Sequence, residues 1–160
     1  MAQVKIPHYL LEFVVFISGA VVMVLELTGS RILSPYLGTS TFVWTSLIGI
    51  ILGSLSLGYH LGGKFADKKA SAQGLSLIIF IAAILIGLAS DLNQLILDQI
   101  SANIHDLRLG SIIAATLIFA PASVFLGMVS PYAIRLKLNT LKTSGQTIGN
   151  LYAISTIGSI

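Results

Sequence analysis

The sequence contains no cysteine, so disulfide frameworks, thiolate metal sites and cysteine nucleophiles are excluded. Charge is scarce as well: 9% of the 160 residues are Asp, Glu, Lys or Arg, whereas soluble domains carry about 25%. Hydrophobic residues make up 55%, and the mean hydropathy is +0.93. A water-soluble fold of this length needs a more polar surface. The composition therefore excludes a soluble enzyme, a disordered tail and a nucleic-acid-binding module, and it indicates an integral membrane protein with the lipid bilayer as partner.

Apolar stretches recur along the chain and predict membrane-spanning helices. A span needs roughly 20 residues to cross a hydrocarbon core of about 30 Å. We predict an all-α, polytopic membrane helix bundle with four transmembrane helices and a partial fifth, at residues 9–29, 41–62, 75–92, 111–134 and 149–160. Because the fifth stretch is too short to span and no polar tail follows it, we expect the chain to be the front part of a longer protein.

Basic residues cluster in three regions that a serpentine chain places at one end of the bundle. These residues are Lys5 near the amino terminus, Lys64, Lys68 and Lys69 after the second span, and Arg135, Lys137 and Lys142 after the fourth. Loops rich in Lys and Arg stay in the cytoplasm. We therefore predict a multi-pass protein of the cell membrane with a cytoplasmic amino terminus.

Residues 91–108 place Leu and Ile at helical spacing, with polar residues on the opposite side, which indicates an amphipathic helix. We expect this segment to lie on the outer face of the membrane and to cap the bundle.

The second span carries small residues at steps of three and four, namely Ser46, Gly49, Gly53 and Ser56. Gly49-x-x-x-Gly53 and Gly58-x-x-x-Gly62 are both pairs that let another helix backbone approach closely. We expect these residues to pack inside the bundle, with homodimerisation through this span as the alternative.

The fourth span contains Pro121 and Pro131, each of which removes one backbone hydrogen bond from a helix. Broken membrane helices often mark binding sites in transporters. We predict a helix break at Gly127 and Pro131, with a simple kink as the alternative.

Glu26 is a carboxylate at membrane depth, where an ionisable group is costly and should face the bundle interior or a wet cavity. It either binds a cation or carries a proton, or it pairs with Arg31, which requires the helix to end near Gly29. A buried polyamine site needs carboxylates and aromatic faces. The predicted ligand-binding residues are therefore Glu26, Arg31, Tyr36 and Trp44.

The segment that follows the second span resembles the short cytoplasmic loop signature of major facilitator transporters, through Gly63, Asp67, Lys68 and Lys69. The resemblance implies a major-facilitator-like bundle in which Asp67 and the basic residues form a charge lock that steadies one face.

An ordered series of segments closely resembles the amino-terminal membrane half of spermidine-synthase-like membrane proteins. The segments are residues 25–31, 35–40, 43–46, 126–133 and 149–159. In that family a transporter-like helical module is fused to a soluble, Rossmann-like aminopropyltransferase domain. This sequence has no strand–Gly-x-Gly–helix unit. We therefore expect the soluble catalytic domain to be absent from this chain, and we predict no catalytic residue, cofactor or metal within it.

The resemblance implies a membrane module of a polyamine aminopropyltransferase-related protein, which anchors a fused or associated soluble domain and handles a polyamine. Two alternatives stay open. One is a fragment of a major-facilitator-like small-molecule transporter, and the other is a structural membrane assembly partner.

Overall fold

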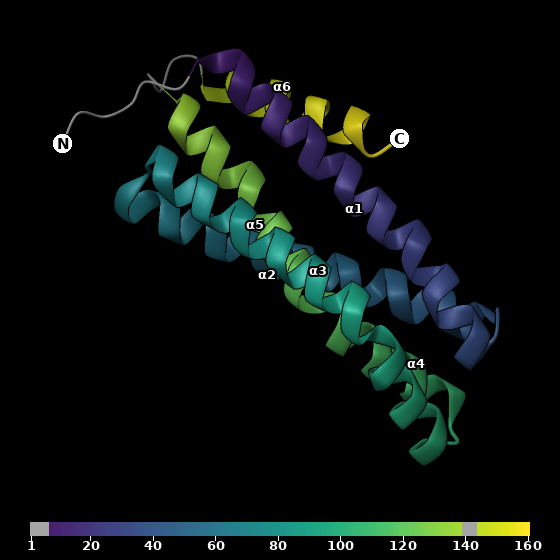
Figure 1. Ribbon diagram of the computed structural model, residues 1–160. Helices are drawn as coiled ribbons and strands as arrows, with labels where there is room; N and C mark the ends of the chain where they lie inside the picture. The colour runs from purple at the N-terminus through teal and green to yellow at the C-terminus, as the bar shows by residue number, and fades with distance from the viewer. Residues whose placement is uncertain (1–6, 139–143) are drawn as a thin grey trace.

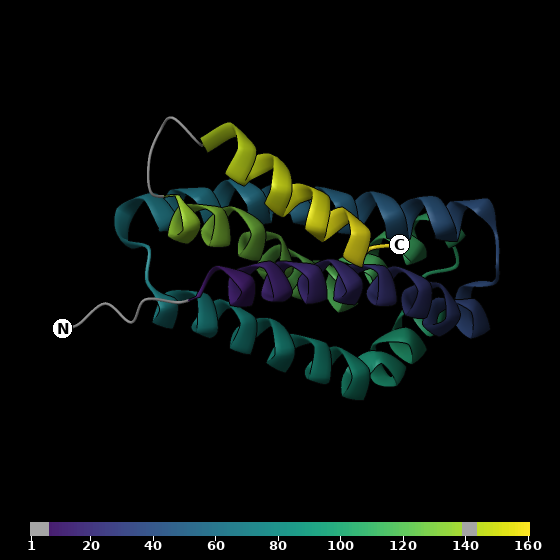
Figure 2. The ribbon, with the colours of Figure 1, turned by 90° about the horizontal axis from the view of Figure 1, so that it is seen from above.

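The computed structural model describes residues 7–138 and 144–160, and the secondary structure in these ranges is α-helical throughout. The helices are α1 (His8–Leu37), α2 (Thr41–Lys69), α3 (Ala72–Asn103), α4 (Leu107–Ile118), α5 (Ala120–Lys137) and α6 (Ser144–Gly158). Figures 1 and 2 show α1, α2, α3 and the bent pair α4–α5 running back and forth along one long axis, with α6 beside α1.

Helices α1, α2 and α3 are each long and apolar enough to cross a membrane, and α4 with α5 forms a fourth span if the bent pair crosses as one unit. Helix α6 has 15 residues, fewer than the roughly 20 that a span needs. The chain is thus a multi-pass helical bundle, and the prediction of an all-α membrane fold is confirmed at this level.

Helix α1 continues past Gly29, where we placed the end of the first span, and it includes Pro35. It ends at Gly38, whose φ of 76° is a conformation that glycine adopts without steric cost. The Gly38 N–H donates to the Ser34 carbonyl oxygen at 2.9 Å, which closes the last turn. Glu26 therefore lies well inside a continuous helix, about 16 Å from its carboxyl end at 1.5 Å per residue.

Helices α2 and α5 pack in backbone contact along a glycine seam formed by Gly58, Gly62 and Gly127. A Cβ atom on Gly58 would lie 2.2 Å from the carbonyl oxygen of Val124. A Cβ on Gly62 or on Gly127 would lie 2.6 Å from a backbone oxygen of the other helix. The expected close packing of the Gly58–Gly62 pair is confirmed.

The other glycine pair of α2 lies on an open face, since Gly49 and Gly53 are exposed and have no atom of a neighbouring element within 4 Å of a built Cβ. Our expectation that this pair packs inside the bundle is wrong for the described residues. Gly49 lies nine residues before Gly58, and Gly53 lies nine residues before Gly62. At about 100° per residue this offset puts the two pairs on opposite sides of the helix.

The predicted surface helix at residues 91–108 does not exist as a separate element. Helix α3 runs unbroken from Ala72 to Asn103, because this segment contains no proline and no glycine after Gly87. The chain turns only at Ile104, and the Asp106 carboxylate caps α4 by accepting the N–H of Arg108 at 2.8 Å and that of Leu109 at 3.2 Å. At 1.5 Å per residue α3 is about 48 Å long, which exceeds a hydrocarbon core of about 30 Å.

The helix break of the fourth span lies at Phe119, where α4 and α5 meet at 53°. Pro121 is the second residue of α5, so its missing N–H falls in a first turn, where it has no helical partner to lose. The break predicted at Gly127 and Pro131 is wrong, because α5 continues through both residues. Gly127 serves instead as the α5 member of the glycine seam.

Two ion pairs and one hydrogen bond tie the carboxyl end of α5 to its neighbours. Lys137 donates to Glu12 of α1, and Arg135 Nε lies 3.5 Å from Asp67 Oδ1 of α2. The Ser71 N–H, between α2 and α3, donates to the Tyr132 hydroxyl at 3.3 Å. These contacts place two of the predicted basic regions at the same end, whereas Lys5 and Lys142 lie outside the described residues. Membrane orientation stays a prediction.

Candidate functional site

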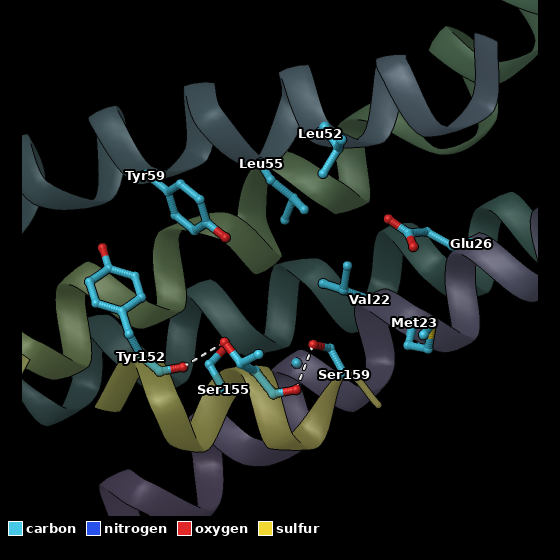
Figure 3. Close-up of a pocket in the computed structure, with 11 residues that line it drawn as sticks. Val22, Met23, Glu26, Leu52, Leu55, Tyr59, Tyr152, Ser155 and Ser159 are labelled. Carbon is cyan, nitrogen blue, oxygen red and sulfur yellow. Dashed lines mark hydrogen bonds between the residues drawn. The ribbon is translucent and has the colours of Figure 1, made fainter. Parts of the chain in front are cut away.

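A cleft of about 320 Å³ lies between α1, α2 and α6 and contains the one carboxylate of the spans that we singled out. Figure 3 shows residues of these three helices around it. Its polar lining consists of Glu26, Tyr59, Tyr152, Ser155, Thr156 and Ser159.

Helical periodicity explains why these side chains meet. Helix α1 contributes positions 19, 22, 23 and 26, and α6 with the turn that follows it contributes 152, 155, 156 and 159. Both sets follow the i, i+3, i+4, i+7 spacing that keeps residues on one helix face. Helix α2 contributes positions 52, 55 and 59, also on one face. Apolar side chains such as Val22 and Leu55 separate the polar groups.

Glycines bring α6 against α1 and thereby build one side of the cleft. A Cβ on Gly19 would lie 2.2 Å from the Ser155 carbonyl oxygen, and a Cβ on Gly158 would lie 2.2 Å from that of Phe16. No larger side chain fits at this crossing without moving the helices apart. The position of Tyr152 relative to Glu26 therefore depends on these two glycines.

Glu26 is half-buried and directs its carboxylate toward the cleft (Figure 3). None of the described residues that line the cleft carries a positive charge. The alternative pairing with Arg31 does not occur within the described part of the chain, where Arg31 is exposed. Because α1 continues beyond Gly29, five residues turn the two side chains about 140° apart.

Two tyrosines supply the aromatic surface of the cleft, Tyr59 from α2 and Tyr152 from α6. Each is 42% exposed, so the cleft is open on their side. In Figure 3 the Tyr59 hydroxyl and the Glu26 carboxylate lie at two ends of the cleft and point toward its middle. Carboxylates and aromatic rings are both groups that attract cations, and this cleft contains both.

The predicted ligand residues are only partly brought together. Arg31, Tyr36 and Trp44 do not line the cleft. Tyr36 packs against the core near the far end of α1, and Trp44 is exposed on α2. Sequence reasoning missed Tyr59 and Tyr152, because their positions in the cleft depend on how α2 and α6 dock against α1.

Two hydroxyls that line the cleft, Thr156 on α6 and Ser159 in the turn after it, already donate their hydrogens to carbonyl oxygens. Thr156 Oγ1 donates to the Tyr152 carbonyl oxygen at 2.9 Å, and Ser159 Oγ donates to the Thr156 carbonyl oxygen at 2.9 Å. Each hydroxyl oxygen retains lone pairs. This wall therefore offers acceptors to a ligand.

The loop-signature residues lie apart from the cleft, at the carboxyl end of α2. Asp67 pairs with Arg135, and both side chains are largely exposed. Lys68 is exposed, and Gly63 has open space around it. The side chain of Lys69 lies outside the described residues.

Comparisons of the chain with protein-family models, with curated proteins and with solved structures found no match.

Proposed function

We propose that this chain is the membrane module of a spermidine-synthase-like protein, which anchors an aminopropyltransferase-related domain or partner and holds a cationic polyamine in the cleft between α1, α2 and α6. The observation that carries the proposal is Glu26, a carboxylate that faces a cleft whose described lining contains no positive charge.

The physical setting supports cation binding. A carboxylate inside a membrane span is expensive unless a partner or function offsets its cost. Tyr59 and Tyr152 add ring faces that attract an ammonium group. The volume of about 320 Å³ falls within the range of small-molecule sites, about 300–1,000 Å³.

The binding proposal is tested by measuring spermidine binding to the purified protein in lipid nanodiscs. Glu26→Gln keeps the shape of the side chain and removes its charge, so we expect at least a tenfold loss of affinity. Asp98→Asn is the control, because it removes one negative charge from an exposed site on α3. Equal spermidine binding by wild type and a folded Glu26→Gln protein would refute the proposal.

The anchoring proposal is tested in cells that express the chain from its own locus. We expect aminopropyltransferase activity in the membrane fraction and expect deletion of the chain to release or abolish it. Membrane-bound activity that is unchanged after deletion would contradict anchoring.

A second candidate function is a major-facilitator-like transporter module, and the Asp67–Arg135 pair favours it. The pair joins the signature-like end of α2 to α5, as a charge lock would. Uptake of labelled spermidine into proteoliposomes tests this function. We expect Asp67→Asn to change the uptake rate while leaving equilibrium binding in the cleft intact, and an absence of uptake by wild type would exclude the transporter.

A third candidate is a structural assembly partner, favoured by the open face of α2 at Gly49 and Gly53. A homodimer through this face should cross-link in the membrane through cysteines introduced beside it. Gly53→Leu should abolish the cross-link, whereas Ile48→Leu on the same helix should not. A monomer at all protein-to-lipid ratios would exclude this function.

A further inference from the structure

We infer that the cleft binds one primary ammonium group at a time. Its ligand class is then a primary amine, and further ammonium groups on the same molecule contribute little to affinity. This inference rests on the proposed cation-binding function of the cleft and specifies which cation it takes. Its basis is the inventory of groups around the cleft: one carboxylate, two tyrosine rings and neutral hydroxyls.

The charge inventory limits the number of ammonium groups that the cleft can stabilise. Glu26 can neutralise one ammonium, and the remaining described lining residues are uncharged side chains and glycine. A second ammonium inside the same cleft would lose hydration without gaining a carboxylate, which is unfavourable. A diamine or triamine should therefore insert one end and gain little from its other nitrogens.

Hydrogen bonding selects the kind of ammonium. A primary ammonium has three N–H donors. The Glu26 carboxylate can accept them as charge-assisted hydrogen bonds, and the hydroxyl oxygens of Thr156 and Ser159 line the same cleft as further acceptors. Both hydroxyls spend their hydrogens on carbonyls of α6, so toward the cleft they act as acceptors. A quaternary ammonium has no N–H to give them and keeps only the charge and the ring faces.

The two tyrosines contact a different part of the ligand from the part that Glu26 binds. The rings of Tyr59 and Tyr152 flank the open side of the cleft, at a distance along the helices from Glu26 (Figure 3). An alkyl chain extending from an ammonium at Glu26 would pass these rings on its way out. The tyrosines thus contact the alkyl part of the ligand, and their exposed ring faces attract a further ammonium only weakly.

The experiment compares four probes on the full chain in nanodiscs: butylamine, 1,4-diaminobutane, spermidine and butyltrimethylammonium. We expect the three primary amines to bind within about threefold of one another. Butyltrimethylammonium should bind about tenfold more weakly, since it forgoes charge-assisted hydrogen bonds. Affinity that rises tenfold or more with each added amine would overturn the inference, and so would equal binding of the quaternary probe.

A matched pair of variants tests the hydroxyl wall. Thr156→Val removes an acceptor at constant shape and should weaken butylamine several-fold while leaving butyltrimethylammonium unchanged. Thr116→Val is the control, because Thr116 makes the same kind of bond, to the Ile112 carbonyl oxygen at 2.7 Å, at an exposed position of α4. Equal effects of Thr156→Val on the two probes would refute the role of the hydroxyls. Failure of the underlying function has a separate signature, namely that no probe binds in a Glu26-dependent way.

Discussion

The two glycine pairs of α2 have the same sequence pattern and opposite surroundings. Gly58 and Gly62 touch the backbone of α5, so that a Cβ at Gly58 would lie 2.2 Å from a carbonyl oxygen. Among the described residues, no atom of another element lies within 4 Å of where a Cβ on Gly49 or Gly53 would stand. The pattern therefore shows that a helix can be approached closely, while the position of the partner helix decides which side is used.

The largest contrast is expected between Gly58→Ala and Gly53→Ala. An added methyl at Gly58 must push α2 and α5 apart, and such overpacking costs about 1–3 kcal/mol and occasionally more. At Gly53 the methyl enters open space, so unfolding should change little. Detergent-induced unfolding of the two variants measures the difference.

If both variants unfold like wild type, the seam is looser than the backbone contact implies. If both are equally destabilised, another surface covers the face of α2 at Gly49 and Gly53 in the membrane. The two glycine pairs then differ only in the chain on its own.

The next contrast is between the two ion pairs that join α5 to its neighbours, and it measures how much charge adds to the glycine seam. Lys137 is 14% exposed and pairs with Glu12, which is 37% exposed, whereas Arg135 and Asp67 are 51% and 76% exposed. We expect Glu12→Gln to lower the free energy of unfolding by about 1–2 kcal/mol. Asp67→Asn should cost less than about 1 kcal/mol, because water screens an exposed pair.

Salt titration distinguishes the two pairs. Added salt should erase the effect of Asp67→Asn and leave most of the effect of Glu12→Gln. If salt instead erased the effect of Glu12→Gln and spared that of Asp67→Asn, the stronger ion pair would be the one between α2 and α5.

Gly38 represents a third kind of glycine, which is required by its backbone conformation and not by lack of space for a side chain. Gly38 has open space around it, like Gly53, but its φ is 76°. Gly38→Ala should therefore cost about 1 kcal/mol through backbone strain alone. Gly38→Asn should cost about as much, because Asn tolerates positive φ mainly in the αL region and the ψ of −175° at Gly38 lies outside it. Stability equal to wild type for either variant would mean that the turn relaxes.

The smallest expected effect is that of Gly49→Ala. The side chain enters open space on a regular helix, so the free energy of unfolding should stay within about 0.5 kcal/mol of wild type. A loss above 1 kcal/mol, measured in the same detergent unfolding assay, would show that another surface covers this face.

Local sequence pattern predicted the elements better than it predicted their partners. Apolar runs located the membrane helices, since the hydrophobic period and length act within one segment. The same runs did not reveal that α3 continues through Asp91 and Asp98, because a helix can leave the apolar region without ending. Pro131 likewise lies inside a helix that the sequence suggested would break there.

The cleft was predictable only in its carboxylate. Glu26 stands out because charge is rare in an apolar run, which is visible from the sequence alone. Its aromatic neighbours come from α2 and α6, and their approach is set by glycine contacts such as Gly19 with Ser155. We expected Tyr36 and Trp44 because they follow Glu26 closely in the chain. Tertiary packing instead placed residues 33 and 126 positions away in the same cleft.

The glycine seam also has a consequence for biosynthesis. Gly58 and Gly127 are 69 residues apart, so α2 leaves the ribosome well before α5 exists. At about 5–20 residues per second, this interval lasts about 3–14 s. During that time the side of α2 that will meet α5 has only lipid, or the insertion machinery, to cover its backbone. Slowed translation between residues 62 and 127 should therefore prolong the period in which the newly inserted helix is open to degradation by membrane proteases.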